Sequence, residues 1–344
     1  MLPSSILEII ASHLDAADRA RFSCVCRVTR DIDIRQEHIR AIVPAKEHAV
    51  LSFAKWFSAR LKYVKHLELI TDMTLWSYVW RYSGVKIALK LKSAHLYHRI
   101  GSPFVLHSPE DLIPTAPFLE HLMICADGPV HVGAGLSRLR LKYLTVHSTS
   151  SFVTSEMMTF TTPSLEKLYL HGKLSDSISL YGLMSLSKLR YLECPAIMLT
   201  SVIPAIKSLE SLVLHGGLPC TITAYRHIAL KSPLKFVRLV QGHWCNLSWL
   251  PETVETLECV SCDQVNKLPK GLKNLLLLST GINAFAAYNI SKMNLDFFTL
   301  RSFGKSMPVL SVRARVVDVS EEDEQFVTLL HDENVHLNTR ILET

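Results

Sequence analysis

Residues 189–194 read LRYLEC, residues 209–214 read LESLVL and residues 234–239 read LKFVRL. Each segment places an apolar residue at its first, fourth and sixth positions. The same spacing occurs twelve times between residues 64 and 319, and successive first positions are 18 to 28 residues apart. The first positions are Val64, Leu91, Leu119, Leu141, Leu165, Leu189, Leu209, Leu234, Val254, Leu272, Leu295 and Ala314. A period this regular predicts a repeat protein.

The spacing resembles the strand segment of leucine-rich repeats. Each such repeat gives one short parallel strand, whose alternate side chains enter the core, and a return segment that closes the coil. The predicted fold is therefore an α/β leucine-rich-repeat solenoid of about twelve repeats at residues 64–320, with parallel strands on its concave face. Residues 321–344 are expected to form a carboxyl-terminal cap.

Two expectations concern helices. Ala49, Phe53, Phe57 and Leu61 recur near helical spacing, which predicts a helix from His48 to Tyr63 within a linker or amino-terminal cap at residues 36–63. After residue 234 the repeats shorten. We expect little room for a full helix in that last third of the solenoid.

The third, fifth and seventh positions of each repeat point away from the core onto the concave face. Aromatic residues, histidine and arginine are frequent there, and protein interfaces favour aromatic and arginine side chains. A parallel sheet also tolerates aromatic and β-branched residues for purely structural reasons, which is the alternative. The predicted partner-binding residues are His95, Tyr97, His121, Tyr143, His147, Tyr169, His171, Tyr191, His215, Phe236, Arg238, Phe297 and Arg301.

A separate helical head precedes the repeats. Residues 2–32 read LPSSILEIIASHLDAADRARFSCVCRVTRDI, and Ile6, Ile9, Ile10 and Leu14 recur at helical spacing. A second short helix is expected to follow. A hairpin of about 30 residues is too small to be stable alone, so it must pack on the repeats or on a partner.

This head resembles the F-box, whose pattern begins with Leu-Pro and later carries Leu-Asp and Val-Cys-Arg. The matching residues here are Leu2-Pro3, Leu14-Asp15 and Val25-Cys26-Arg27. With the repeats, nearly the whole chain is similar to F-box leucine-rich-repeat proteins, the substrate receptors of cullin-RING (SCF-type) ubiquitin ligases. The resemblance implies that an F-box-like motif at residues 1–35 binds the ligase adaptor subunit while the concave face holds a protein substrate. The adaptor-binding residues it implies are Leu2, Pro3, Ile6, Leu7, Ile9, Leu14, Val25 and Cys26.

A second reading is a non-catalytic scaffold subunit of a large, stable assembly, which would use the same surfaces to bind neighbouring subunits. Two features favour it: Thr29 stands where the F-box pattern usually has Trp, and the isoelectric point is about 8.8. The two readings differ in stoichiometry, because a receptor exchanges its partners whereas a scaffold keeps them in fixed ratio.

Composition indicates which partners and which cellular compartments fit the chain. The net charge is +6, but the basic residues are scattered, so nucleic acid is not an expected partner. Eight cysteines without a signal peptide or a long apolar stretch fit a reducing, soluble compartment. We expect the cytoplasm, the nucleus or both, or a mitochondrion if a presequence has been removed.

No motif predicts catalysis. The sequence has no phosphate-binding glycine loop, no nucleophile elbow and no zinc-protease helix motif, so an enzyme is not expected. Cys259 and Cys262 have metal-ligand spacing, but burial as small core residues is the favoured interpretation. His147, His171 and His215 share a column that could bind a metal or respond to pH, although protein contact is favoured. No cofactor and no metal site are predicted, and no small-molecule ligand is identified.

Overall fold

The structure is a computed structural model, and the chain divides into two compact units, Met1–Lys188 and Leu189–Thr344. Each unit is described by itself. The residues that the structure describes are 6, 9–10, 13–14, 18, 37–43, 46–58, 63–71, 90–98, 104–106, 116–128, 130–132, 139–153, 163–174, 186–200, 203, 206–216, 230–244, 247, 249–265, 267–302 and 307–330.

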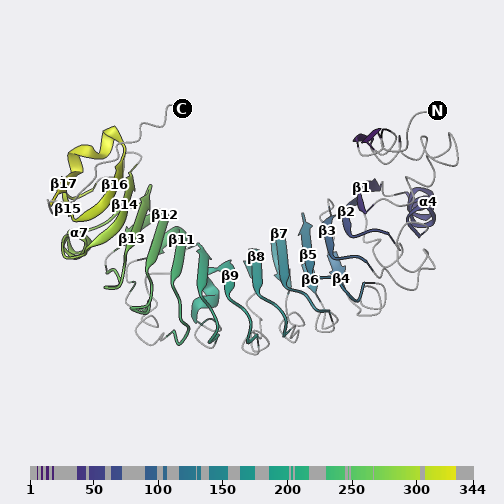
Figure 1. The fold of residues 1–344 in the computed structure, drawn as a ribbon, viewed down its shortest axis with the longest axis horizontal. Coiled ribbons are helices and arrows are strands. Elements are labelled where there is room, and N and C mark those ends of the chain that lie inside the picture. Colours follow the sequence, from purple (N-terminus) through teal and green to yellow (C-terminus); the bar gives the residue numbers. More distant parts are fainter. Residues whose placement is uncertain are drawn as a thin grey trace. The chain divides into compact units, whose positions relative to one another are not determined.

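The first unit is built on a parallel sheet in which neighbouring strands follow each other in the order of the sequence (Figure 1). Its path is β1 (His38–Val43), β2 (His66–Thr71), β3 (Ser93–His98), β5 (His121–Ala126), β7 (Tyr143–Val153) and β8 (Lys167–Leu174). Two short strands, β4 (Phe104–Leu106) and β6 (Val130–Val132), pair with each other, and β6 pairs with the end of β7.

The second unit repeats the arrangement. Its sheet follows the order β9 (Tyr191–Pro195), β10 (Ser211–His215), β11 (Phe236–Trp244), β12 (Thr256–Val265), β13 (Asn274–Leu278), β14 (Leu295–Arg301) and β16 (Ala314–Val319). A 3₁₀ helix, η4 (Ala196–Thr200), follows β9. Each described pairing between these strands is parallel.

The repeat pattern correctly predicted the strands and the core. All twelve predicted segments contain a strand, and the first, fourth and sixth positions are buried with a single exception, the half-buried Val319. Side chains alternate between the two sides of a strand, so the fourth and sixth positions both enter the interior. The first position lies at or just before the start of the strand and is buried as well. The parallel-strand solenoid is therefore the consequence of one apolar spacing used repeatedly.

Hydroxyl side chains also join consecutive repeats. Ser164 donates a 2.9 Å hydrogen bond to the carbonyl of Leu141, the first-position residue of the preceding repeat. Ser208 bonds the Leu189 carbonyl in the same way at 2.7 Å. Thr253 does so with Leu234 at 2.9 Å. In each case a Ser or Thr directly before a first-position residue satisfies a backbone acceptor at the turn, where a buried carbonyl would otherwise lack a partner.

Strand β1 is one of the strands that the sequence analysis missed. Residues 36–63 were expected to be a helical linker or cap, but β1 lies within them and pairs in parallel with β2. Its Ile39, Ala41 and Val43 are buried and alternate with exposed residues, which is the strand period. The expected helix is present as α4 (Glu47–Ser58).

The expectation about short repeats was wrong at one place. Helix α7 (Ala284–Ser291) lies between β13 and β14, where the sequence analysis left little room for a helix. The side chain of Asn283 accepts a hydrogen bond from the Ala286 N–H at 2.9 Å and caps the helix. The return segment is long enough because the first positions Leu272 and Leu295 are 23 residues apart, more than in the repeats on either side.

The carboxyl-terminal cap is partly described. It contains a 3₁₀ helix, η7 (Glu321–Phe326), and a strand, β17 (Val327–Leu329), which pairs with β15 (Leu310–Val312). Asp323 is buried there and accepts hydrogen bonds from Ser302 and Ser320. Burial raises the pKa of Asp323, but these hydrogen bonds outweigh it and hold the pKa below its ordinary value. Residues 331–344 of the expected cap lie outside the described part.

Within the described residues, no helix is both long and apolar enough to cross a membrane.

The alternation of buried and solvent-facing residues leads to a first prediction. Leu144 is a fully buried fourth-position residue of β7. Leu144→Ala should lower the free energy of unfolding by about 2 to 5 kcal/mol, because the substitution leaves a cavity. Its neighbour Thr145 faces solvent in part, so Thr145→Ala should cost less than about 1 kcal/mol. Urea unfolding of both variants measures the difference. Equal losses would contradict the assignment of the two sides of β7.

A second prediction concerns a close backbone approach. A Cβ at Gly281 would lie 2.2 Å from the carbonyl oxygen of Asp263, so Gly281→Ala should destabilise the protein by about 1 to 3 kcal/mol. Gly216 has φ +74° and no atom within 4 Å of a Cβ. Gly216→Asn should cost less, because it meets no clash and Asn tolerates positive φ better than most side chains. Thermal unfolding compares the two variants. A Gly281→Ala variant as stable as the wild type would contradict the predicted clash with the Asp263 carbonyl.

Candidate binding surface

In-register pairing places equivalent residues of successive repeats side by side. In the first unit the third positions follow one another from strand to strand as His66, Ser93, His121, Tyr143 and Lys167. Neighbouring strands are about 4.8 Å apart, so side chains in one column contact each other. The solvent-facing side of each sheet is thus a set of parallel columns.

All thirteen partner-binding residues predicted from the sequence lie on these columns, and none of them is buried. Seven belong to the first unit: His95, Tyr97, His121, Tyr143, His147, Tyr169 and His171. Six belong to the second unit: Tyr191, His215, Phe236, Arg238, Phe297 and Arg301. Their position is as predicted, and their role in binding stays a prediction.

The third-position column of the first unit is a ladder of aromatic and polar contacts. The His121 ring stacks on Tyr143 with a centroid distance of 4.3 Å. The Lys167 ammonium lies 5.2 Å from the Tyr143 ring centroid, within range of a cation–π interaction. The His66 ring is hydrogen-bonded to the Ser93 hydroxyl at 2.7 Å. The column therefore presents a pre-ordered row of flat side chains, which interfaces use at low entropic cost.

The imidazoles of this column are shifted toward the neutral form. Burial lowers the pKa of His121, and the nearby Lys142 ammonium lowers it further. Burial also lowers the pKa of His66, as do the neighbouring His38 and Lys65. Near neutral pH these rings therefore offer aromatic surface and hydrogen bonds rather than positive charge.

A hollow of about 430 Å³ lies on the same side of the first unit. It is lined by Arg40, Glu68, Ile70, Tyr97, His98, Cys125, Ala126, Asp127, His147 and Thr149. The sequence analysis had selected Tyr97 and His147 from this set and missed the other eight. Its volume is within the range of ligand pockets, about 300 to 1,000 Å³.

Two groups in the hollow are held in the protonated form. Burial raises the pKa of the Cys125 thiol. Burial also raises the pKa of the Tyr97 phenol, and the neighbouring Cys125 and Glu68 add to that effect. Arg40 forms an ion pair with Glu68 at 3.2 Å across β1 and β2. The hollow therefore contains two hydrogen-bond donors, the thiol and the phenol, and one ion pair whose opposite charges cancel.

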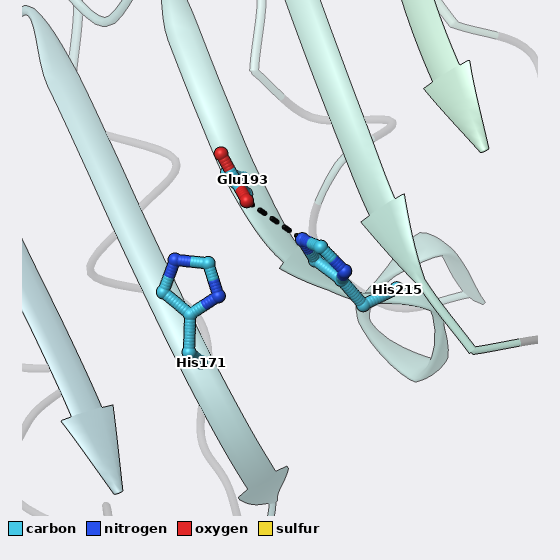
Figure 2. A group of neighbouring side chains, drawn as sticks. All are labelled: His171, Glu193 and His215. Atoms are coloured by element: carbon cyan, nitrogen blue, oxygen red, sulfur yellow. Dashed lines mark hydrogen bonds and ion pairs between the residues drawn. The ribbon is translucent and has the colours of Figure 1, made fainter. Parts of the chain in front are cut away.

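The second unit carries pairs of opposite charge between neighbouring strands. Glu193 accepts a hydrogen bond from the Tyr191 hydroxyl at 2.8 Å, and one of its oxygens lies 2.7 Å from His215 Nε2 (Figure 2). Arg238 lies 3.6 Å from Glu258. Such partly exposed pairs contribute about 0 to 1 kcal/mol each, so they orient the side chains more than they stabilise the sheet.

The acidic partners in these contacts were missed as site residues. Arg301 lies 2.6 Å from Asp318, which the sequence analysis did not select. The signal was available, because Glu193, Glu258 and Asp318 all occupy fifth positions beside a repeat with a basic or histidine side chain. Phe297 of the same unit keeps 55% of its surface exposed.

The cysteines with metal-ligand spacing are buried, as predicted. Cys259 and Cys262 are fully buried, and the Cys262 thiol lies 3.5 Å from the Leu239 carbonyl oxygen. A hydrogen bond with Cys262 and burial both raise the pKa of Cys259. Both thiols therefore belong to the core of the second unit.

The amino-terminal head is described at six positions. Ile6, Ile9 and Ile10 are helical and exposed, and Leu14 is half-buried. The other predicted adaptor-binding residues, Leu2, Pro3, Leu7, Val25 and Cys26, lie outside the described residues.

Comparison with known families assigns this head. Residues 1–33 match the family model of the F-box domain. No curated protein matches the chain. The chain thus combines an F-box domain with a parallel-strand solenoid.

The shifted histidine provides a third prediction. Changing Lys142 to Met removes a positive charge near His121, so the pKa of His121 should rise toward its ordinary value. Glu120 loses its 3.1 Å ion-pair partner in the same variant, which acts in the same direction. NMR titration of the imidazole measures the shift. Lys167→Met is the control, and a larger shift there would contradict the assigned cause.

Proposed function

We propose that this chain is a substrate receptor of an SCF-type cullin-RING ubiquitin ligase. The F-box domain at residues 1–33 is the observation that carries the proposal, because domains of this family bind the ligase adaptor subunit. The solenoid supplies a second, independent surface for a protein substrate. The chain itself would catalyse no reaction, and it would work in the cytoplasm or nucleus.

The exposed head residues support adaptor binding. Ile6 and Ile9 keep 42% and 60% of their surfaces exposed, and Ile10 lies beside them. Branched aliphatic side chains grouped on one short helix form an apolar patch, and such patches mark interaction sites. Burial of these side chains against the adaptor would contribute about 1.5 to 3 kcal/mol each.

The columns of the solenoid support substrate binding. Stacked His121 and Tyr143 in the first unit, and exposed Phe297 in the second, are side chains that interfaces favour. Charged pairs such as Arg238 with Glu258 lie on the same side of the second unit as Phe297. Protein interfaces combine aromatic side chains with polar groups of this kind.

The adaptor contact gives a fourth prediction. The double variant Ile6→Asp, Ile9→Asp should lower affinity for the adaptor at least about a hundredfold, because two charges replace an apolar contact. Pull-down and calorimetry with the purified adaptor measure it. Circular dichroism should remain that of the wild type, since both side chains are exposed.

A matched control is available in the second unit. Phe285 of α7 is also an exposed apolar residue, and Phe285→Asp should leave adaptor binding unchanged. A well-folded wild type that binds no adaptor would overturn the receptor proposal. Recovery of the chain in fixed ratio within one stable assembly, without a cullin, would identify it as a scaffold subunit instead.

A further inference from the structure

The hollow of the first unit carries an unbalanced negative charge. Three of its lining side chains have a formal charge: Arg40, Glu68 and Asp127. Arg40 and Glu68 neutralise each other as an ion pair at 3.2 Å. Asp127 is exposed, and its carboxylate has no ion-pair partner within the described part of the chain. The hollow therefore keeps one negative charge that a ligand can neutralise.

The seventh-position column explains why the surface is hollowed at this place. Tyr97, Cys125 and His147 are paired in register on β3, β5 and β7. Strands two places apart are separated by about 10 Å, so the two ring-bearing residues flank the short Cys125 side chain. Ala126, which is also small, lines the hollow beside it. A small side chain between two large ones leaves space that a ligand group can enter.

The backbone of neighbouring strands fixes the position of Asp127. Its N–H donates a hydrogen bond to the His98 carbonyl at 3.0 Å, and its own carbonyl accepts one from the Thr149 hydroxyl at 2.6 Å. Both contacts use the Asp127 main chain and leave its carboxylate available. Arg40 lies on β1, three strands from β5, which corresponds to about 14 Å of sheet. The unbalanced carboxylate and the neutralised pair are therefore at different ends of the hollow.

We propose that this hollow binds the guanidinium group of an arginine in the protein substrate. The inference rests on the proposed function for the origin of the arginine. It deepens that function, because it names a residue type that the first unit selects in a substrate.

The chemistry of the hollow matches a guanidinium group in charge and in shape. This group is always charged, and its planar fork binds a carboxylate such as that of Asp127 through two parallel hydrogen bonds. It also stacks on aromatic faces, which Tyr97 provides, while the arginine stem packs on apolar surface such as Ile70. An anionic ligand would instead be repelled by Asp127.

A lysine side chain fits the same hollow less well. Its ammonium is a compact, strongly hydrated point charge, so it forms neither the parallel pair of hydrogen bonds nor a flat stack. The proposal therefore predicts a preference for arginine over lysine. It also predicts that a neutral group of the same shape as guanidinium binds weakly.

The experiment measures peptide binding to the full chain by saturation-transfer difference NMR, which detects weak ligands. The probe is a capped peptide of glycine and serine with one central arginine, for which we expect a Kd of about 1 mM. Replacing the arginine by citrulline keeps the shape and removes the charge, and it should weaken binding at least about tenfold. Replacement by lysine should weaken binding at least about threefold.

Three variants of the chain test the residues. Asp127→Asn should weaken binding of the arginine peptide at least about tenfold and leave the circular dichroism unchanged, since this side chain is exposed. Glu166→Gln is the matched control, because it removes the same charge from the first unit outside the hollow and should leave binding unchanged. Cys125→Phe should abolish binding by filling the space between Tyr97 and His147, with Asp127 still in place.

Several outcomes would overturn the proposal: equal binding of the arginine and citrulline peptides, or equal effects of Asp127→Asn and Glu166→Gln. Free arginine bound at least about tenfold more tightly than the peptide would overturn the assignment to a protein residue. Adaptor binding is measured on the same samples and should survive Asp127→Asn. A chain that binds the adaptor but not the arginine peptide contradicts this inference alone, whereas one that binds the peptide but no adaptor contradicts the receptor proposal.

Discussion

Parallel pairing of consecutive strands is the constraint on which this structure depends. A single strand such as β9 has an apolar side with Leu192 and Cys194 that it cannot bury alone. The next strand, β10, places Leu212 and Leu214 against the same interior in register. Each repeat therefore needs its neighbours, and burial rather than any one polar contact holds the array together.

The same pairing organises the outer side of the sheet. Because Cys125, His147 and His171 are equivalent positions, whatever the sequence places there becomes a column. A column such as His121 and Tyr143 becomes a row of stacked rings at the surface. One geometry thus serves every column, and the side chains decide what each column offers to a partner.

In the proposed function, the two regions of the chain have different roles. The F-box domain at residues 1–33 explains how the chain would join a ligase, whereas the solenoid explains how it would select a protein. A receptor of this design needs no catalytic group of its own. The first unit carries the hollow lined by Tyr97, and the second unit carries the exposed Phe297.

The sequence alone determined which residues of the twelve repeat segments enter the core, because one apolar spacing recurs and each recurrence must be buried. It also placed Tyr143 and His121 on the outer side, since alternation along a strand leaves them no other position. It did not predict β1, whose alternating Ile39, Ala41 and Val43 lack the full repeat pattern, nor α7, which begins at the Asn283 cap.

Only the tertiary structure decided which outer side chains meet. Arg40 and Glu68 are 28 residues apart in sequence and become partners through the register of β1 with β2. The hollow that joins Tyr97, Cys125 and Asp127 has no local signal in the sequence, because its depth depends on the size and rotamer of side chains from several strands. The spacing of the repeats determines which side chains face the core and which face solvent. Packing between repeats determines which of the solvent-facing side chains come into contact.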